Sequence, residues 1–404
     1  MKGKAMTITE APNIELMAGT FYTEDPYRAF AWMRRHAPVF WDRAGEVWGI
    51  TRYADVRAIG QDPQNFSSAQ GSRPNIPLPY MIDMDAPEHR RRRRLVSAGF
   101  TPEAVRIREP RVRQVCDEIL DTVCESGSCD LVSAIAAPLP LVMIADMLGF
   151  PPADWSRLLE WSDTMLMSQG SPDPDAFVHA ANAFSEWDAY VRHQIAERRA
   201  NATTDDLLGA LAHGEIEGDR LDDTTLVYEA LLILIGGDET SRHVISGGME
   251  ALLNNPAQLR ALKENRELLP GAVEEMLRWV TPIKNMNRNA TRDVELHGQT
   301  IRAGQNVLLL YPSANRDETV FTDPETFDIH RHPNDHVAFG FGAHLCLGHR
   351  LARAEIAGMV DRLLDRFDDL TLATDDPPHL RVSNFIVGHE SMPVRFTPSA
   401  PVGG

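Results

Sequence analysis

Residues 222 to 255 limit the possible folds more than any other segment, because they have the pattern of a helix that is apolar on nearly every side around residues 230 to 235. A helix without a polar face must be surrounded by other elements. Two glycines and two acids, Gly236 to Glu239, stand in its middle. Each interior glycine costs about 0.5 to 1 kcal/mol relative to alanine, and a buried acid costs more without a partner. We therefore expect a large helical protein with a functional centre here, or alternatively two helices separated by a C-cap at the glycines.

Helical periodicity also dominates the rest of the chain. Further helices are expected over residues 102–124, 153–200, 257–263, 268–279 and 347–366. Strand-like stretches are short, as in EVWGITRY, DVELHGQTIRAGQNVLLLY and SMPVRFTP. This pattern predicts a mainly α fold of the α+β class with small antiparallel sheets. Because no Gly/Ser-rich linker or internal repeat divides the sequence, we expect a single domain over residues 1–404.

Charge and hydropathy exclude several classes of protein. Asp plus Glu number 58 against 40 Lys plus Arg, and the net charge of −18 argues against binding to nucleic acid or anionic lipid. The first residues lack the continuous apolar stretch of a signal peptide. The most apolar later region, residues 132–150, is interrupted by Pro138, Pro140 and Asp146. We therefore expect a cytoplasmic protein with no membrane anchor and no nucleic-acid partner.

One cysteine stands in an unusual setting. The stretch VAFGFGAHLCLGHRLARAE, residues 337–355, places Cys346 among three glycines and two histidines just before a predicted helix. Glycines suit a tight turn close to a bound group, and a helix start favours the thiolate form. The alternatives are a nucleophile, a metal ligand, or a buried small residue. Cys116, Cys124 and Cys129 lack a matching pair at zinc spacing and are interpreted as incidental thiols.

Together these segments resemble the cytochromes P450, a family of haem-thiolate monooxygenases. Residues 339–348 resemble the family's haem-binding loop, residues 236–241 its oxygen-activating helix motif, and residues 275–278 its E-x-x-R helix. The fit follows the family's order from the stretch DAPEH at residue 85 to the stretch SMP at residue 391. The resemblance implies the P450 fold and a haem b cofactor, iron protoporphyrin IX, with Cys346 as the iron ligand. Thiolate is the strongly electron-donating ligand that favours O–O cleavage.

The resemblance also implies residues that bind the cofactor. Two haem propionates need cationic or donor partners when buried. For His89 and Arg93 the alternative interpretation is a solvated helix face, and for Arg288 it is a surface charge on a strand. Backbone N–H groups of the cysteine loop are expected to temper the charge of the sulfur. The residues are His89, Arg93, Arg288 and His344 for the propionates, and Phe339, Gly340 and Gly348 around the sulfur.

Glu239 and Thr240 are the predicted catalytic pair, because oxygen bound to iron needs two protons before its O–O bond can break. An acid and an alcohol at this place favour the reductive route over a peroxide-driven peroxygenase. No flavin or iron–sulfur domain is visible in the sequence. A ferredoxin and an NAD(P)H-dependent ferredoxin reductase are therefore expected as separate partners.

Two further groups of charges follow from the resemblance. Glu275 and Arg278 are expected to form a structural ion pair behind the cysteine loop, with Arg331 as the candidate third partner and Arg316 less favoured. The run Arg90 to Arg94 holds more cations than propionates require. A positive patch on an acidic protein suits the docking of an acidic ferredoxin, with a solvated helix face as the alternative.

Within the family, the chain most resembles actinobacterial, especially mycobacterial, enzymes that hydroxylate the terminal methyl, C26 or C27, of the cholesterol or cholest-4-en-3-one side chain and carry it on to the carboxylic acid. The stretches RPNIPLPYMIDMDAPEH and LLPGAVEEMLRWVTPIKNMNRNA carry much of this resemblance. The expected lining is apolar, which suits a hydrocarbon ligand. A branched fatty acid or terpenoid is the alternative substrate, and a haem-based ligand sensor the alternative function. The predicted substrate-binding residues are Ile76, Leu78, Met81, Ile82, Ile235, Gly236, Val280, Ile283, Met286, Ile386 and Val387.

Overall fold

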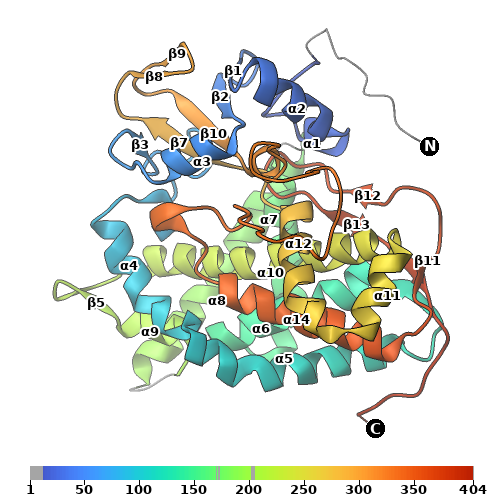
Figure 1. Ribbon diagram of the computed structural model, residues 1–404. Coiled ribbons are helices and arrows are strands. Elements are labelled where there is room, and N and C mark those ends of the chain that lie inside the picture. Colours follow the sequence, from blue (N-terminus) through green and yellow to red (C-terminus); the bar gives the residue numbers. More distant parts are fainter. Residues whose placement is uncertain (1–11, 170, 172, 202–204, 404) are drawn as a thin grey trace.

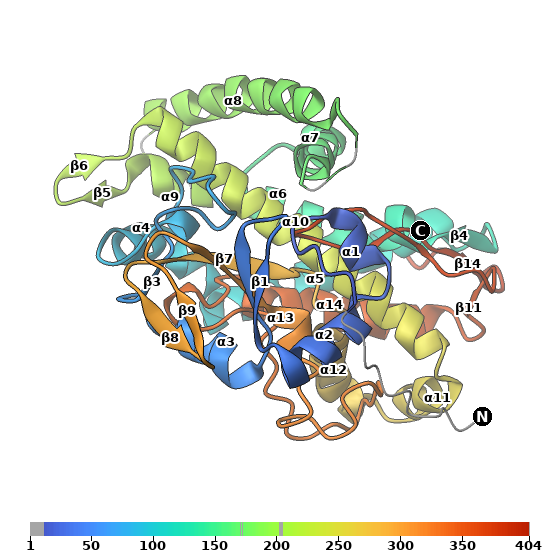
Figure 2. The same ribbon diagram turned by 90° about the horizontal axis from the view of Figure 1, so that it is seen from above.

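The segment expected to form a central helix is one continuous helix. In the computed structural model, which describes residues 12–169, 171, 173–201 and 205–403, helix α10 (Asp223–Leu253) spans 31 residues without a break at its glycines, so the C-cap alternative is wrong. The carboxylate of Asp222 caps it by accepting the N–H of Thr225 at 2.9 Å. Seen from above, α10 runs diagonally through the middle of the molecule (Figure 2).

Other helices pack around α10, most closely α6, α12, α14 and α8, and α5 packs against α14 (Figure 1). A single turn, η1 (Met81–Asp83), precedes α4. The remaining helices are α1 (Gly19–Thr23), α2 (Pro26–His36), α3 (Tyr53–Gly60), α4 (Glu88–Ser97), α5 (Pro102–Val123), α6 (Pro138–Leu148), α7 (Trp155–Met167), α8 (Ala176–Ala200), α9 (Leu207–His213), α11 (Pro256–Glu264), α12 (Leu269–Val280), α13 (Tyr311–Ala314) and α14 (His349–Arg366).

Most predicted helices agree with the structure, and one does not. The helices α5, α10, α11, α12 and α14 begin and end within two residues of the predicted bounds. The helix expected over 153–200 is instead two helices, α7 and α8, with Pro174 in a turn between them. Proline lacks the N–H that a helix interior requires. Helix α6 was not predicted, because its Pro138 and Pro140 lie in the first turn, where no such N–H is needed.

The strands form small sheets beside the helices (Figure 1). The largest has the order β1-β2-β10-β7-β3, and β10 runs parallel to β2 but antiparallel to β7. This sheet is therefore mixed, because β2 and β10 are joined by a long crossover that permits parallel pairing. The strands are β1 (Val39–Asp42), β2 (Val47–Ile50), β3 (Phe66–Ser67), β4 (Ser128–Asp130), β5 (Glu215–Ile216), β6 (Asp219–Arg220), β7 (Asn285–Ala290), β8 (Val294–Leu296), β9 (Gln299–Ile301), β10 (Asn306–Leu310), β11 (Thr371–Leu372), β12 (His379–Leu380), β13 (His389–Ser391) and β14 (Pro393–Arg395).

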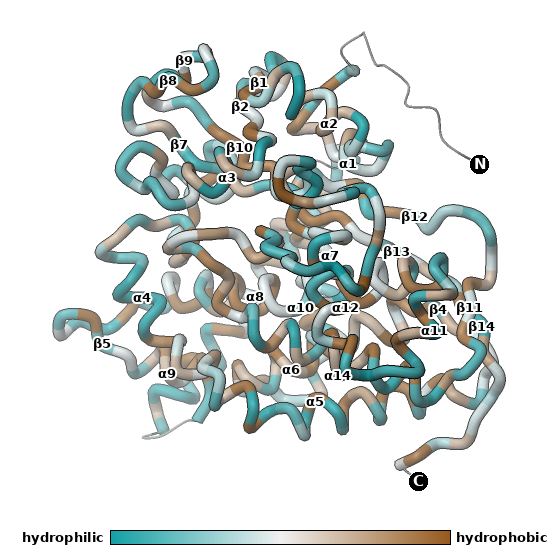
Figure 3. Tube along the Cα trace, viewed as in Figure 1, coloured by the Kyte–Doolittle hydropathy of each residue, from teal (hydrophilic) through white to brown (hydrophobic). Residues whose placement is uncertain are grey.

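The hydrophobic core consists of separate clusters, and two of them meet along α10. Residues of α10 up to Leu234 pack into a buried cluster with α6, α7, α8 and α9. Residues from Val244 onward pack into a second cluster with α5, α12 and α14. Apolar positions, brown in Figure 3, recur along the helices of both regions. The motif at residues 236–241 therefore lies between two packed cores. No helix in the described part of the chain is long and apolar enough to cross a membrane.

Candidate active site

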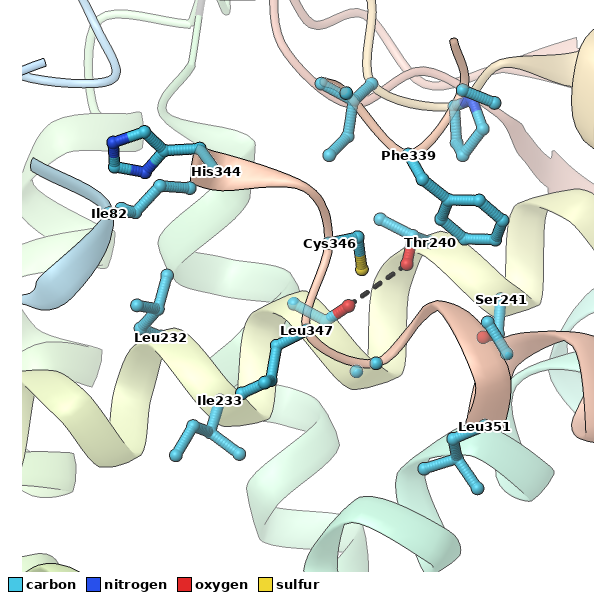
Figure 4. A pocket seen from close by; sticks show the side chains of 18 of the residues that line it. Ile82, Leu232, Ile233, Thr240, Ser241, Phe339, His344, Cys346, Leu347 and Leu351 are labelled. Carbon is cyan, nitrogen blue, oxygen red and sulfur yellow. Dashed lines mark hydrogen bonds between the residues drawn. The ribbon is translucent and has the colours of Figure 1, made fainter. Parts of the chain in front are cut away.

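A cavity of about 1380 Å³, including its mouth, lies between α10 and the loop that carries Cys346 (Figure 4). Cys346 lines it from the loop, and Thr240 lines it from α10. The walls between them are mainly apolar, with Leu232 and Ile233 from α10 and Ile82 from η1 (Figure 4). All the residues predicted to bind the cofactor line this one cavity, namely Cys346, His89, Arg93, Arg288, His344, Phe339, Gly340 and Gly348.

A tight turn presents Cys346 to the cavity. Gly340 and Gly342 have φ values of +69° and +75°, in the left-handed region that favours glycine. A Cβ on Gly342 would lie 2.1 Å from the carbonyl oxygen of Gly60, so the turn packs directly on the end of α3. The N–H of Cys346 donates to the carbonyl oxygen of Phe339 at 2.9 Å. This short ring of backbone fixes the position of the sulfur just before α14.

The state of the Cys346 thiol differs from the sequence expectation. Burial raises its pKa, and the N–H of Gly348 and the charge of Arg93 offset this only in part. The expectation that the helix start by itself favours thiolate is therefore wrong, because loss of hydration penalises the anion more than the helix start stabilises it. A coordinating metal ion deprotonates a thiol outright. A thiolate at Cys346 would therefore require such an ion, because the helix start by itself does not offset burial.

Two arginines and two histidines meet at the edge of the cavity. Arg93 donates to the carbonyl oxygen of Leu345 at 2.6 Å, which ties α4 to the cysteine loop. The rings of His89 and His344 lie 4.1 Å apart. Burial and neighbouring arginines lower the pKa of His89 to about 4 and that of His344 to about 2, so both rings are neutral. Within the described residues neither Arg93 nor Arg288 pairs with a carboxylate, which leaves two cations suited to anionic ligand groups.

A fully buried ion pair supports the loop from behind. Arg278 donates to both carboxylate oxygens of Glu275, at 2.8 and 2.7 Å. Arg331 donates to the same carboxylate at 3.1 Å. Arg316 instead pairs with Glu325 at 3.2 Å. Of the two candidates for the third partner, Arg331 is the one that contacts Glu275.

The two glycines of the α10 motif have different surroundings. A Cβ on Gly236 would meet no atom within 4 Å, so the helix leaves open space there. A Cβ on Gly237 would lie 2.7 Å from Ile144, so that glycine allows α6 to approach. The hydroxyl of Thr240 donates to the carbonyl oxygen of Gly236 at 3.0 Å (Figure 4). The motif therefore combines room for a ligand with a hydroxyl at its edge.

Glu239 does not line the cavity, contrary to the role expected for it. Its buried carboxylate accepts hydrogen bonds from Arg242 at 2.5 Å and from Arg381 at 2.9 Å. Burial raises its pKa, but Arg242, His243 and Arg381 outweigh burial and hold the pKa well below the usual range. Of the two neighbours of Thr240 in the chain, Ser241 lines the cavity, whereas Glu239 lies on the opposite side of Thr240, against Arg242 and Arg381. Glu239 is thus an ionised member of a salt-bridge cluster.

Two other acids, Asp238 of α10 and Glu355 of α14, are buried and have raised pKa values. Neither oxygen of Asp238 has a hydrogen-bond partner among the described residues, and burial together with Glu239 raises its pKa to about 8. Glu355 of α14 lines the cavity and accepts the hydroxyl of Ser241 at 2.8 Å, and burial raises its pKa to about 8. Sequence reasoning missed Glu355, because only helix packing brings it to Ser241.

The cavity includes some of the predicted substrate-binding residues and omits others. Those that line it are Met81, Ile82, Gly236, Ile283 and Met286. Those that do not line it are Ile76, Leu78, Ile235, Val280, Ile386 and Val387.

The omitted residues have identifiable surroundings elsewhere. Ile76 is 43% exposed, Val280 packs against Gly247 of α10, and Val387 belongs to a core cluster with α2. Ile235 lies five residues before Thr240, about 140° around the helix. The missed lining residues of α10 are Leu232, Ile233, Gly237, Ser241 and Val244. Their helical spacing from Thr240 was a signal that could have identified Ile233 and Val244.

The Cys346 sulfur, the apolar walls and two arginines that pair with no carboxylate among the described residues are suited to a haem with its propionates. The cytochrome P450 family model matches residues 23–391, and the chain belongs to the cytochrome P450 family of monooxygenases. The family implies a haem-thiolate cofactor.

Individual relatives agree with this assignment. A steroid C26-monooxygenase of Mycobacterium tuberculosis is 50% identical over 402 residues, covering 98% of this chain and 100% of the relative. A methyl-branched lipid omega-hydroxylase of the same species is 38% identical, covering 95% of each chain. The structure of a Mycobacterium marinum cytochrome P450 in complex with pseudoionone matches with a TM-score of 0.89 at 32% identity, covering 97% of this chain and 100% of the other.

Proposed function

We propose that this protein hydroxylates the terminal methyl, C26 or C27, of the side chain of cholesterol or cholest-4-en-3-one, and carries the alcohol on to the carboxylic acid. The observation that carries the proposal is the 50% identity to a steroid C26-monooxygenase over 98% of the chain. The reaction inserts one atom of O2 into a C–H bond and reduces the other to water, with two electrons and two protons.

The chemistry of the cavity supports a hydrocarbon substrate. Its apolar residues offer area for burial, which stabilises a bound ligand by about 25 cal/mol per Å². Two arginines, Arg93 and Arg288, and one buried acid, Glu355, line the cavity. We assign the two arginines to the cofactor and Glu355 to proton storage, so no cation remains for a substrate carboxylate. Branched side chains of the cavity wall, such as Ile283, favour presentation of a slender chain end.

We propose haem b as the cofactor, bound by Cys346 through its sulfur and by Arg93, Arg288, His89 and His344 through the propionates. When bound, the haem supplies the oxygen chemistry. Neutral His89 and His344 act as hydrogen-bond donors and the arginines as charges. Phe339, Gly340 and Gly348 shape the backbone around the sulfur.

The buried acids suggest how protons are handled. We propose that Thr240 positions a hydroxyl where oxygen binds, and that Glu355 holds a proton at its carboxyl group beside Ser241. A serine hydroxyl both donates and accepts, so Ser241 can pass a proton from Glu355 toward Thr240. Glu239 remains ionised between Arg242 and Arg381 and positions α10.

We further propose that electrons come from a ferredoxin and an NAD(P)H-dependent ferredoxin reductase. In the run 90–94, Arg91 pairs with Glu88 at 3.4 Å and Arg92 with Glu229 at 3.2 Å. Arg90 and Arg94 are exposed. These two exposed cations, on the helix that contacts the cysteine loop, suit electrostatic steering of an acidic ferredoxin.

Omega-hydroxylation of a methyl-branched lipid is the second candidate function, favoured by the 38% identity to such an enzyme. An apolar cavity suits both substrates, and both reactions attack a chain end.

One experiment distinguishes the two substrates. The haem-loaded protein is titrated with cholest-4-en-3-one and with a methyl-branched fatty acid, and the shift of the Soret band from low to high spin is recorded. Each substrate is then incubated with a ferredoxin system, and the products are identified by mass spectrometry. We expect the sterol to give the spin shift and a terminal alcohol. If only the fatty acid gives both, the steroid assignment is wrong. The Cys346→Ser variant is the control for haem-independent oxidation.

A further inference from the structure

A second ion pair lies behind the cysteine loop, beside the E-x-x-R pair. Arg353 of α14 donates two N–H groups to Glu274 of α12, at 2.6 and 2.8 Å, in a bidentate arrangement. Its remaining terminal nitrogen contacts Nδ1 of His349 at 2.9 Å and donates to the carbonyl oxygen of His349 at 3.0 Å. Every nitrogen of the guanidinium therefore has a partner, and the orientation of the group is fixed.

The guanidinium of Arg353 lies over the ring of Phe339. Its central carbon is 4.6 Å from the ring centroid, a cation–π distance. The rings of His336 and His349 flank Phe339 at 6.0 and 5.9 Å. The carbonyl oxygen of Phe339 accepts the N–H of Cys346. A continuous set of contacts thus joins Glu274, Arg353, Phe339 and Cys346.

The two charges of this pair lie at different places relative to the sulfur. Arg353 contacts the ring of Phe339 at 4.6 Å, and the carbonyl oxygen of Phe339 accepts the N–H of Cys346 at 2.9 Å. Glu274 sits beyond the guanidinium and also contacts His336 at 3.1 Å. Although burial raises the pKa of Glu274, Arg353 and His336 lower it to about 2, so the carboxylate stays charged. The pair thus presents a cation that reaches the cysteine loop through Phe339 and an anion that is bound to this cation.

We propose that Arg353, oriented by Glu274, is a positioning residue that raises the reduction potential of the thiolate-ligated iron. This inference rests on the assignment of Cys346 as the iron ligand. Reduction adds one electron to the iron–thiolate unit, so a nearby cation stabilises the reduced form and a nearby anion destabilises it. Phe339 contacts the cation with its ring and Cys346 with its carbonyl oxygen, so it links the two. Side-chain exposures of 35% and 30% for Arg353 and Glu274 mean that solvent screens part of the effect.

Opposite shifts from the two partners test the proposal. Arg353→Met removes the charge and keeps the stem, so we expect a lower potential. Glu274→Gln removes the anion and leaves the cation uncompensated, so we expect a higher potential. Each shift should change the ratio of reduced to oxidised iron at fixed potential by about three- to tenfold, where tenfold corresponds to about 59 mV for one electron. The measurement is a spectroelectrochemical titration of the haem-loaded protein without ferredoxin.

Matched controls separate charge from structure. Arg353→Lys keeps the charge and should stay near the wild-type potential. Arg350→Met removes an exposed cation from the same helix and should shift the potential less than Arg353→Met. If Arg353→Met fails to take up haem, Glu274→Gln alone must still raise the potential.

Two results would overturn the proposal. Shifts of the same sign in Arg353→Met and Glu274→Gln, or equal shifts in Arg350→Met and Arg353→Met, would mean that the pair only braces α12 against α14. The reduced carbon-monoxide spectrum of the wild type reports independently on thiolate ligation. Its absence would remove the Cys346 assignment itself, whereas a failed potential test with the spectrum intact leaves that assignment standing.

Discussion

Buried acids and arginines occur on both sides of the cavity, but the two sides differ in how many of the carboxylates are paired with a cation. Behind Cys346, the carboxylate of Glu275 accepts hydrogen bonds from Arg278, Arg331, Asn334 and the N–H of Asp328. Both of its oxygens are therefore occupied, and the charge cannot move. Around the centre of α10, by contrast, some buried acids have arginine partners and others do not.

On the α10 side, Arg242 and Arg381 bind Glu239 and Asp163, but among the described residues no arginine binds Asp238 or Glu355. Asp238 has no hydrogen-bond partner among the described residues, and Glu355 accepts the hydroxyl of Ser241. A buried acid paired with a cation stays ionised, whereas a buried acid without one retains its proton. The difference suggests that the cysteine side holds fixed charge near the sulfur, and that the α10 side stores protons near the oxygen site. The following predictions test this contrast.

The largest expected effect concerns the sulfur. Cys346→Ser should abolish the reduced carbon-monoxide band that is diagnostic of thiolate ligation, because a neutral alcohol is a weak iron ligand. Absorption spectroscopy of the reduced protein under carbon monoxide measures this. Cys129→Ser, at a half-buried position on β4, is the matched control and should keep the band. Retention of the band in Cys346→Ser would exclude Cys346 as the ligand.

Next in size is the loss of fixed charge on the cysteine side. Glu275→Gln should lower the free energy of unfolding by about 3 to 5 kcal/mol, because Arg278 would remain buried without its carboxylate. Glu103→Gln breaks an exposed pair with Arg106 and should cost less than about 1 kcal/mol. Chemical denaturation of both variants measures the difference. Equal effects in the two variants would mean that Glu275 is not a structural tie.

A smaller effect is expected at the hydroxyl on the α10 side. Thr240→Ala should leave haem and substrate binding nearly unchanged but lower the yield of product per NAD(P)H by about tenfold, with hydrogen peroxide formed instead. This loss is below the 10²- to 10⁴-fold typical of a missing general acid, because water can partly replace the hydroxyl. Parallel assays of NAD(P)H, product and peroxide measure the coupling. Unchanged coupling would refute a role for Thr240 in proton delivery.

The last prediction concerns stored protons and appears as a gradual change of stability with pH. Between the usual pKa of glutamate, 4.5, and about 8, the unfolded chain loses the proton that folded Glu355 keeps, so the free energy of unfolding falls as pH rises. The slope from this group is at most about 1.4 kcal/mol per pH unit.

Glu355→Gln should remove that slope, because glutamine does not titrate. Denaturation at several pH values, compared with Asp238→Asn as a second variant, measures it. We expect both variants to be less sensitive to pH than the wild type over this range. Identical pH profiles for wild type and Glu355→Gln would show that Glu355 is ionised in the folded protein.

Local sequence patterns were sufficient for several features. The length of α10 and the bounds of α5, α11, α12 and α14 follow from helical periodicity, which involves neighbouring residues only. The break between α7 and α8 was missed, although Pro174 was a visible signal. The motifs were also sufficient to select Cys346, Thr240, Arg93 and Arg288, which line one cavity.

The sequence by itself thus determined which segments form helices, in what order the motifs occur, and which side chains carry the chemistry. The tertiary structure alone decided which acids are ionised and which residues form the cavity wall. Ser241 and Glu355 are 114 positions apart, and Arg381 lies 142 positions from Glu239. Hydration and charge at these groups depend on distances between such remote residues, and a local pattern contains no information about those distances.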